Sequence, residues 1–289
     1  MIAFNHNVIA PFIGKENLKR NALKTLTVLK KRKKITPLAF GRSYEQNQGR
    51  EVSLSTDISF IKNVQNQKWV FEVKDIVSFY WEQSSYELYY YEGENGNATL
   101  SKYWFLHTFL PVFLSIEDKF ELIHAGGVEL KGKPVLFIAP SYGGKSTITD
   151  YFLKKGHIMV SDDRVGIYED TLIKTISSYP YHRPYRKMED LGIKVENFMT
   201  TVKNLHIIYL LQRVNPLEKI SFELLEGIET FKALQYNFDF ILPLNKARSF
   251  ELIAKIASKI EIYKLSVPWD LERLDEVYQE ICKHSNSRK

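Results

Sequence analysis

The sequence predicts an α/β protein in two parts: a small β-rich α+β domain over residues 1–116 and a larger domain over residues 117–289. Short runs of aromatic and β-branched residues, which favour strands, dominate the first part. In the second part, apolar strand-like runs alternate with helix-length segments, as in layered α/β domains. A glycine-rich turn between an apolar strand and a helix in this second part predicts an anion-binding loop.

The first part contains four runs that combine aromatic and β-branched residues, at positions 52–55, 69–73, 77–81 and 86–91. Turn-like stretches such as 93–97 separate or end them, so they predict the strands of a small meandering sheet. Its tyrosines are expected to pack on a half-buried face rather than to stack on a ligand. Residues 101–116 are bulky and apolar and predict a helix that Pro111 kinks or breaks.

A basic run from Lys15 to Lys34 precedes these strands. One interpretation is the solvated face of an amphipathic helix whose apolar side carries Leu18, Ala22, Leu26 and Leu29. The other is a patch that binds nucleic acid or a membrane surface. The basic helix is favoured over nucleic-acid binding, because no aromatic residue interleaves the charges to stack on bases.

Composition limits the class of protein. The 289 residues carry a net charge of +6, and 44% are hydrophobic and 26% charged, which is ordinary for a soluble globular protein. No run approaches the roughly 18 to 20 apolar residues that cross a bilayer, and no secretory segment is recognisable. The single cysteine, Cys282, excludes an internal disulfide framework. We therefore expect a cytoplasmic protein with no membrane span.

The second part follows a regular order of elements. Strands are expected over 128–130, 135–139, 157–161, 205–211 and 260–265, and helices over 146–155, 226–234, 249–258 and 271–283. Gly126, Gly127 and the first of these strands predict a β-hairpin into the second strand. Gly156 lies where a left-handed residue is expected to end a helix.

The stretch after residue 140 has the composition of a phosphate-binding loop. Gly143 and Gly144 lack a Cβ, so their backbone can approach an anion closely. Lys145 can place its ammonium on the β- and γ-phosphates of ATP, and Ser146 can offer its hydroxyl to Mg²⁺. The pattern G-x-x-x-x-G-K-[ST] fails only where Ala139 replaces the first glycine. The predicted ATP-binding residues are Ser141, Tyr142, Gly143, Gly144, Lys145, Ser146 and Thr147.

Two adjacent carboxylates, Asp162 and Asp163, end the next apolar strand. Ligands bind to α/β sheets at the carboxyl ends of strands, so both are candidates for the same site. One carboxylate can hold Mg²⁺, and the other can accept a proton from an attacking hydroxyl. His124 precedes the predicted hairpin, which could bring its imidazole near the phosphates; an ordinary structural histidine is the alternative.

Together, His124, the Gly144–Thr147 segment and residues 155–165 resemble the catalytic domain of HPr kinase/phosphorylase. The likeness extends to HPr-kinase-like serine kinases with a phosphoenolpyruvate-carboxykinase-like P-loop core. Its layout covers roughly residues 118 to 284, and its specific motifs cover about 122 to 168. The segment 260–271 and the helix after it also resemble the closing strand and helix of the smaller relatives.

The resemblance implies a role for each site residue. Lys145 and the loop amides would bind the triphosphate, Ser146 and Asp163 would serve Mg²⁺, Asp162 would be the base toward a serine hydroxyl, and His124 would orient or tune that base. Glu189 departs from the family pattern, because an arginine precedes the Gly-Leu-Gly-Ile residues in HPr kinases. Arg183 or Arg186 could instead stabilise the transferred phosphate, although a surface arginine is an equal alternative.

The sequence therefore predicts an ATP- and Mg²⁺-dependent phosphotransferase that acts on a hydroxyl, with serine of a protein or small peptide as the favoured acceptor. A small-molecule kinase that acts on a sugar or amino acid remains an alternative, as does a nucleotide-sensing module without catalysis. HPr kinases form hexamers and the smaller relatives need not, so a homo-oligomer also stays open.

Overall fold

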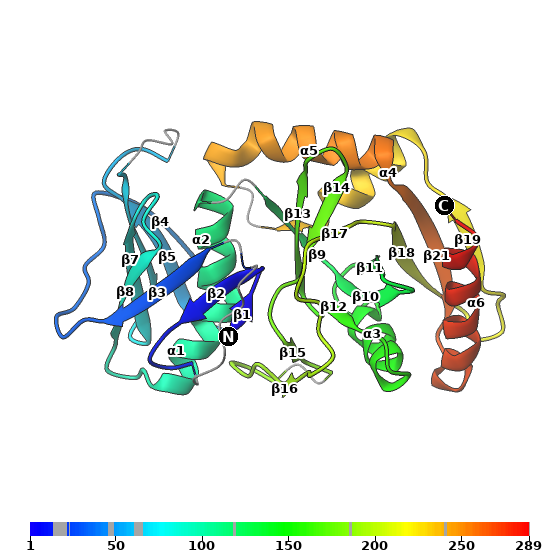
Figure 1. Ribbon diagram of the computed structural model, residues 1–289, viewed down its shortest axis with the longest axis horizontal. Helices are drawn as coiled ribbons and strands as arrows, with labels where there is room; N and C mark the ends of the chain where they lie inside the picture. Colours follow the sequence, from blue (N-terminus) through cyan, green and yellow to red (C-terminus); the bar gives the residue numbers. More distant parts are fainter. Residues whose placement is uncertain are drawn as a thin grey trace. The chain divides into compact units, whose positions relative to one another are not determined.

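The computed structural model describes residues 1–13, 22, 24–45, 49–60, 66–117, 120–184, 187–239 and 242–288. The chain is mixed α/β and divides into two compact units (Figure 1). Unit 1 consists of residues 1–119 with the later segments 187–191 and 240–247, and unit 2 consists of 120–186, 192–239 and 248–289. Among the described residues, every helix is too short or too polar to cross a bilayer.

Unit 1 is built on an eight-stranded sheet. In spatial order its strands are β1 (Ile2–Ala3), β2 (His6–Ile9), β3 (Thr25–Lys30), β8 (Glu87–Glu92), β7 (Val77–Glu82), β6 (Lys68–Val73), β5 (Glu51–Thr56) and β4 (Phe40–Glu45). The strands β4 to β8 form an antiparallel meander. This agrees with the strands predicted from the four aromatic and β-branched runs.

The prediction of a basic helix over Lys15 to Lys34 is wrong for residues 25–30, which form β3. This strand pairs in parallel with β2 and β8. Leu26 and Val28 are buried while Thr25 is exposed and Thr27 is half-buried, which is the two-residue period of a strand. The β-branched residues Thr25, Thr27 and Val28 also favour extended backbone. Residues 14–21 and 23 lie outside the described part of the chain.

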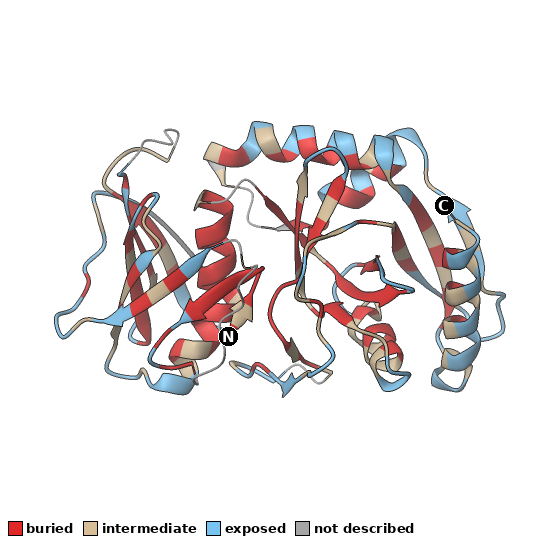
Figure 2. Ribbon diagram, viewed as in Figure 1, coloured by how far each residue is buried: buried red, intermediate tan, exposed pale blue. Residues whose placement is uncertain are grey.

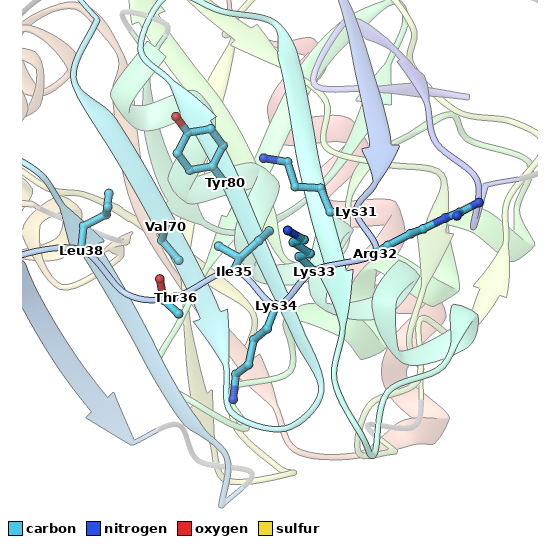
Figure 3. Close-up of a pocket in the computed structure, with 9 residues that line it drawn as sticks. All are labelled: Lys31, Arg32, Lys33, Lys34, Ile35, Thr36, Leu38, Val70 and Tyr80. Carbon is cyan, nitrogen blue, oxygen red and sulfur yellow. The ribbon is translucent and has the colours of Figure 1, made fainter.

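The end of the basic run lines a cavity of about 440 Å³ in unit 1 (Figure 3). Its lining residues are Lys31, Arg32, Lys33, Lys34, Ile35, Thr36, Leu38, Val70 and Tyr80. The ammonium of Lys31 lies over the rings of Tyr80 and Tyr89, at 4.9 and 4.3 Å from their centroids. In Figure 3, Lys31 extends toward Tyr80, whereas Arg32 and Lys34 point away from it. The four cations therefore do not converge on one point, as a built anion site would require.

A long helical segment covers the sheet of unit 1. It comprises α1 (Ala98–Trp104), the π-helix η1 (Phe105–Phe109) and α2 (Leu110–Glu117). Pro111 does not end the helix. It is the second residue of α2, directly after the wider π turn, so the helical hydrogen bond that proline cannot donate falls at the junction of the two helical forms. The segment is buried along α2 (Figure 2). The ring of Phe109 stacks on Phe79 of β7 at 4.3 Å, so aromatic packing holds helix to sheet.

Glu189, which stands where HPr kinases carry an arginine, has a structural role in unit 1. Its two carboxylate oxygens accept hydrogen bonds from Arg50 Nε and Nη2, both at 2.9 Å. Trp104 Nε1 donates to the same carboxylate at 2.8 Å. The hydrogen bond from Arg50 outweighs partial burial and lowers the pKa of Glu189. An arginine at this position would place two guanidinium groups together.

Unit 2 contains a six-stranded sheet and a five-stranded sheet. The first has the order β12 (Met159–Ser161), β10 (Gly126–Leu130), β11 (Lys133–Ile138), β18 (Ile207–Val214), β21 (Glu261–Pro268) and β19 (Ser221–Leu224). The second has the order β17 (Lys203–Asn204), β14 (Ile173–Ile176), β13 (Arg164–Glu169), β9 (Glu121–His124) and β20 (Phe238–Asp239). The short strands β15 (Tyr181–His182) and β16 (Ile193–Lys194) pair with each other.

The helices of unit 2 are α3 (Lys145–Lys154), α4 (Gly227–Gln235), α5 (Lys246–Lys259), whose first two residues fall in unit 1, and α6 (Leu274–Asn286). Single 3₁₀ turns precede α5 and α6, at Pro243–Asn245 and Leu271–Arg273. Alternate residues of β11 pack into two different hydrophobic cores, one on each face of the sheet. Leu136 and Ile138 pack with α5 residues in one core, whereas Val135 and Phe137 pack with α3 and α6 residues in the other. The six-stranded sheet is therefore covered on both faces, as expected for continuous apolar strands.

Two turns of unit 2 contain residues with positive φ, at the hairpin before β11 and at the end of α3. The hairpin between β10 and β11 turns through Lys131 and Gly132, with φ of 50° and 79°. Two successive positive φ values suit the right-handed twist of a tight hairpin. Gly156 follows α3 with φ of 90°, which confirms the predicted left-handed cap.

Candidate functional site

The candidate site lies at one edge of the six-stranded sheet in unit 2. Strand β10 runs antiparallel to both β11 and β12, so β11 and β12 run in the same direction. Their carboxyl ends consequently meet at the same edge, which is where α/β sheets bind ligands. The predicted phosphate-binding loop follows β11, and Asp162 and Asp163 follow β12. Gly127 of β10 bridges the two, because it pairs with Leu136 on one side and Ser161 on the other.

The loop has the backbone that its glycines predict. Gly144 has φ of 95°, in the left-handed region that favours glycine, and it is the residue from which α3 begins. A Cβ on Gly143 would lie 2.4 Å from the Cβ of Ala139 and 2.8 Å from the Pro140 carbonyl oxygen. Ala139 can therefore replace the usual first glycine of the motif only because Gly143 has no side chain.

Lys145 is folded back over this loop. Its ammonium donates to the carbonyl oxygen of Ala139 at 2.7 Å, and the residue is only 3% exposed. The Pro140 carbonyl oxygen lies 3.5 Å from the same nitrogen. The cation thus stands at the α3 N-terminus, where the helix dipole and free backbone N–H groups already favour an anion.

The other predicted ATP-binding residues surround this position on the same loop and first helical turn. Ser141 and Tyr142 are exposed, and Gly143, Gly144, Ser146 and Thr147 are half-buried. Tyr142 is 81% exposed, and its φ of 61° lies in the left-handed region. The loop is therefore open to solvent at the helix N-terminus.

Asp163 is paired with two cationic or ionisable side chains. One carboxylate oxygen lies 3.3 Å from His124 Nδ1, and the other accepts a hydrogen bond from Arg164 at 2.8 Å. The antiparallel pairing of β9 with β13 places His124 opposite Arg164, and Ala125 N–H donates to the Asp163 carbonyl at 3.0 Å. The structure thus brings His124 to the site beside Asp163, not beside Asp162.

Asp162 enters a different set of contacts. Its Oδ2 accepts a hydrogen bond from the backbone N–H of Arg183 at 2.7 Å, and it lies 3.2 Å from His182 Nδ1. Its side chain is 5% exposed, and Oδ1 is buried with no hydrogen-bond partner. His182 Nε2 in turn lies 3.2 Å from Oδ1 of Asp150 on α3. The sequence motifs pointed to neither His182 nor Asp150, although a histidine next to the Arg-Pro segment was a visible signal.

A serine directs the two aspartates apart. The hydroxyl of Ser161 donates to the Arg164 carbonyl at 2.6 Å and accepts from the Asp163 N–H at 3.2 Å. This closes a tight turn directly after β12, which sends Asp162 toward β15 and Asp163 toward β9. The two adjacent carboxylates therefore have separate environments.

Of the two arginines predicted to assist transfer, the structure describes only Arg183. Arg183 is 9% exposed and contacts Asp162 through its main-chain N–H. Arg186 lies outside the described residues, so its predicted role stays a prediction. The structure therefore ties Arg183 to the candidate base through its backbone, a contact that any residue except proline could make.

The residues present fit Mg²⁺ held jointly with a nucleotide. Within the described ranges, no three His, Cys, Asp or Glu side chains cluster closely enough to hold a metal alone. Mg²⁺ ordinarily takes one or two carboxylates and completes its shell with phosphate oxygens and water. Asp163 and the hydroxyl of Ser146 are the predicted protein ligands. Both carboxylate oxygens of Asp163 are paired, with His124 and Arg164, so one of these contacts would have to give way to the metal.

His182 makes the site sensitive to pH. Burial lowers the pKa of His182, but the hydrogen bond and charge of Asp162, followed by those of Asp150, outweigh burial and raise the net pKa. A histidine with a raised folded-state pKa stabilises the fold fully below its unfolded pKa of about 6.5, and this stabilisation is lost as pH rises through the folded value.

We therefore expect the free energy of unfolding of the wild-type chain to fall with rising pH above about 6.5, relative to that of His182→Gln. Urea unfolding of both proteins at a series of pH values measures this difference. The conservative variant keeps a side-chain amide at the same place but cannot become charged. A difference that stays constant from about pH 5.5 to 9 would contradict the raised pKa.

Comparisons with known proteins do not identify a family for this chain. No protein-family model matches the chain, and no curated protein sequence matches it. Among solved structures, the HPr(Ser) kinase/phosphatase from Coxiella burnetii is similar over 58% of this chain and 97% of that chain, with 12% sequence identity and a TM-score of 0.36. Similarity at this level does not establish a shared activity.

Proposed function

We propose that the chain is an ATP- and Mg²⁺-dependent kinase that transfers the γ-phosphoryl group of ATP to a hydroxyl, with serine of a protein or small peptide as the acceptor. One observation carries the proposal: a glycine-lysine loop and two differently paired aspartates lie at the same edge of one sheet. The serine acceptor is supported by the sequence resemblance to HPr-kinase-like serine kinases and not by the geometry.

In this proposal the loop binds the phosphates. The free N–H groups at the start of α3 and the ammonium of Lys145 would contact the β- and γ-phosphates. Lys145 now donates to the Ala139 carbonyl, which is a neutral acceptor. Charged phosphate oxygens are stronger acceptors, so the ammonium is expected to move from the carbonyl to the nucleotide.

Asp162 is the proposed base. The Arg183 N–H and His182 hold its Oδ2, and the buried Oδ1 is left to accept a proton. The acceptor oxygen attacks the γ-phosphorus, the bond to the β-phosphate oxygen breaks, ADP leaves, and the hydroxyl proton passes to Asp162. Mg²⁺, when bound to Asp163, Ser146 and the phosphates, would neutralise charge on the migrating group. His124 would then orient Asp163.

Binding and transfer can be tested separately. We expect the wild type to bind ATP in the presence of Mg²⁺, and Lys145→Ala to bind it at least about tenfold more weakly, since a charge-assisted phosphate contact contributes about 1.5 to 3 kcal/mol. Isothermal titration calorimetry measures both. Lys219→Ala, at an exposed lysine of unit 2, is the matched control and should bind as the wild type does.

The acceptor class is tested with γ-labelled ATP. Incubation with a serine-containing peptide library, and separately with a mixture of sugars and amino acids, should label the peptides. Labelling of the metabolites alone would identify a small-molecule kinase instead. Tight ATP binding with no labelling of either set would favour a nucleotide sensor and overturn the kinase proposal.

A further inference from the structure

A second cavity lies beside the phosphate-binding loop in unit 2. Its volume is about 410 Å³, within the usual range for small-molecule sites. The lining residues are Pro140, Ser141, Tyr142, Gly143, Leu210, Leu211, Gln212, Arg213 and Lys264. They come from the loop, from the carboxyl half of β18 and from β21. Apolar walls are therefore combined with an amide and two cationic side chains.

The sheet order places this cavity opposite the aspartates. Strand β18 neighbours β11 on one side, whereas β10 and then β12 follow on the other. A triphosphate on the loop must direct its γ-phosphate toward Asp162 and Asp163, after β12. Its α-phosphate and the group attached to it must then extend toward β18 and β21. The cavity is thus where the nucleoside of a bound triphosphate would lie.

Arg213, which lines the cavity, stacks on the ring of Trp269. The guanidinium of Arg213 lies 3.2 Å from the ring centroid of Trp269. The backbone N–H of Trp269 donates to the Val214 carbonyl at 3.1 Å, which holds the backbone of Trp269 beside the end of β18. A ring carbon of Trp269 would lie 3.6 Å from a Cβ on Gly144, so the indole reaches the loop itself.

This pair is suited to bind a flat base. Trp269, the stacking partner of the lining residue Arg213, is a large aromatic residue that is 47% exposed. Nucleobases stack on indole rings and on guanidinium planes without strict sequence preference. Gln212 at the cavity wall can both donate to and accept from a base edge. The acceptor substrate is a poor occupant, because its hydroxyl has to reach Asp162 on the opposite side of β11.

We propose that the cavity between the phosphate-binding loop and strands β18 and β21 is a nucleoside pocket, in which the Arg213–Trp269 pair stacks on the purine of the nucleotide. This inference rests on the proposed function, because it assumes a nucleoside triphosphate on the loop. It adds that the base itself contributes to binding, rather than the phosphates alone.

Tryptophan fluorescence tests the pocket directly. The chain has four tryptophans, and Trp69, Trp81 and Trp104 are fully buried in unit 1. ATP should therefore change the fluorescence through Trp269, and this change should be absent in Trp269→Phe. Tripolyphosphate, which has the phosphates without the base, should compete for the loop but leave the fluorescence unchanged.

Affinity separates the pocket from the loop. Trp269→Ala and Arg213→Ala should each weaken ATP binding about tenfold and leave tripolyphosphate binding unchanged, which also verifies that the variants are folded. Leu217→Ala, at a side chain that is 93% exposed, is the control. Equal affinity of the wild type for ATP and tripolyphosphate, with both variants neutral, would overturn the pocket and leave the kinase proposal intact. Failure of the wild type to bind either compound would overturn both.

Discussion

Asp162→Asn is expected to lower phosphoryl transfer by roughly two to four decades, the contribution usual for a general base, while ATP binding stays within about twofold of the wild type. The amide has the shape of the carboxylate and its oxygen can still accept the hydrogen bond from the Arg183 N–H. It cannot take up the proton of the attacking hydroxyl. Transfer of labelled phosphate to the acceptor and calorimetric ATP binding are the two measurements.

Two controls accompany this variant. Asp170→Asn, at an exposed aspartate of unit 2, should retain full activity. Thermal unfolding shows whether loss of the charge beside His182 has destabilised the fold, since His182 is 5% exposed. Near-normal turnover by a folded Asp162→Asn protein would exclude Asp162 as the base. A large loss of ATP affinity instead would assign Asp162 to nucleotide or metal binding.

The second large effect is expected from Gly143→Ala, which should weaken ATP binding about a hundredfold. The added methyl group would lie 2.4 Å from the Cβ of Ala139 and 2.8 Å from the Pro140 carbonyl oxygen. Both distances are far below van der Waals contact, so the loop must change its backbone and lose the arrangement of its N–H groups. Calorimetric titration with ATP measures the effect.

Ala139→Gly provides the matched test of this explanation. The single variant removes a methyl group and should bind ATP as the wild type does. Combined with Gly143→Ala, it removes the closest contact but leaves the Pro140 oxygen at 2.8 Å, so it should restore binding only in part. A double variant no better than Gly143→Ala alone would show that the Ala139 contact does not limit the loop.

Much of unit 2 could be predicted, because its signals are local. The apolar run of β11, the glycines and Lys145 lie within a dozen residues and specify a strand, a loop and the start of a helix. The left-handed Gly156 is likewise a property of one residue at one helix end. The aromatic runs of unit 1 predicted β5 to β8 for the same reason.

The prediction of a helix where β3 forms was wrong because the local sequence fits both a helical and a strand pattern. Leu26 and Leu29 fit one face of a helix, but the strand face carries Leu26 and Val28, which are 0% and 2% exposed. Pairing with β2 on one side and β8 on the other satisfies the backbone of β3 in parallel ladders. Those partner strands come from other parts of the chain. The pattern of apolar residues within residues 25–30 therefore cannot decide between a helix and a strand.

The sequence by itself determined the glycine-lysine loop between a strand and a helix, the carboxylates after the next strand and the order of elements between them. Only the tertiary structure decided that His124 lies beside Asp163, that His182 lies between Asp162 and Asp150, and that Arg213 stacks on Trp269. The two residues of each pair are 20 to 56 positions apart in the sequence. His182 and Asp150 also belong to different kinds of element, the strand β15 and the helix α3. Such contacts depend on strand register and on how helices pack over a sheet, which are set by the core as a whole and not by any short run of residues.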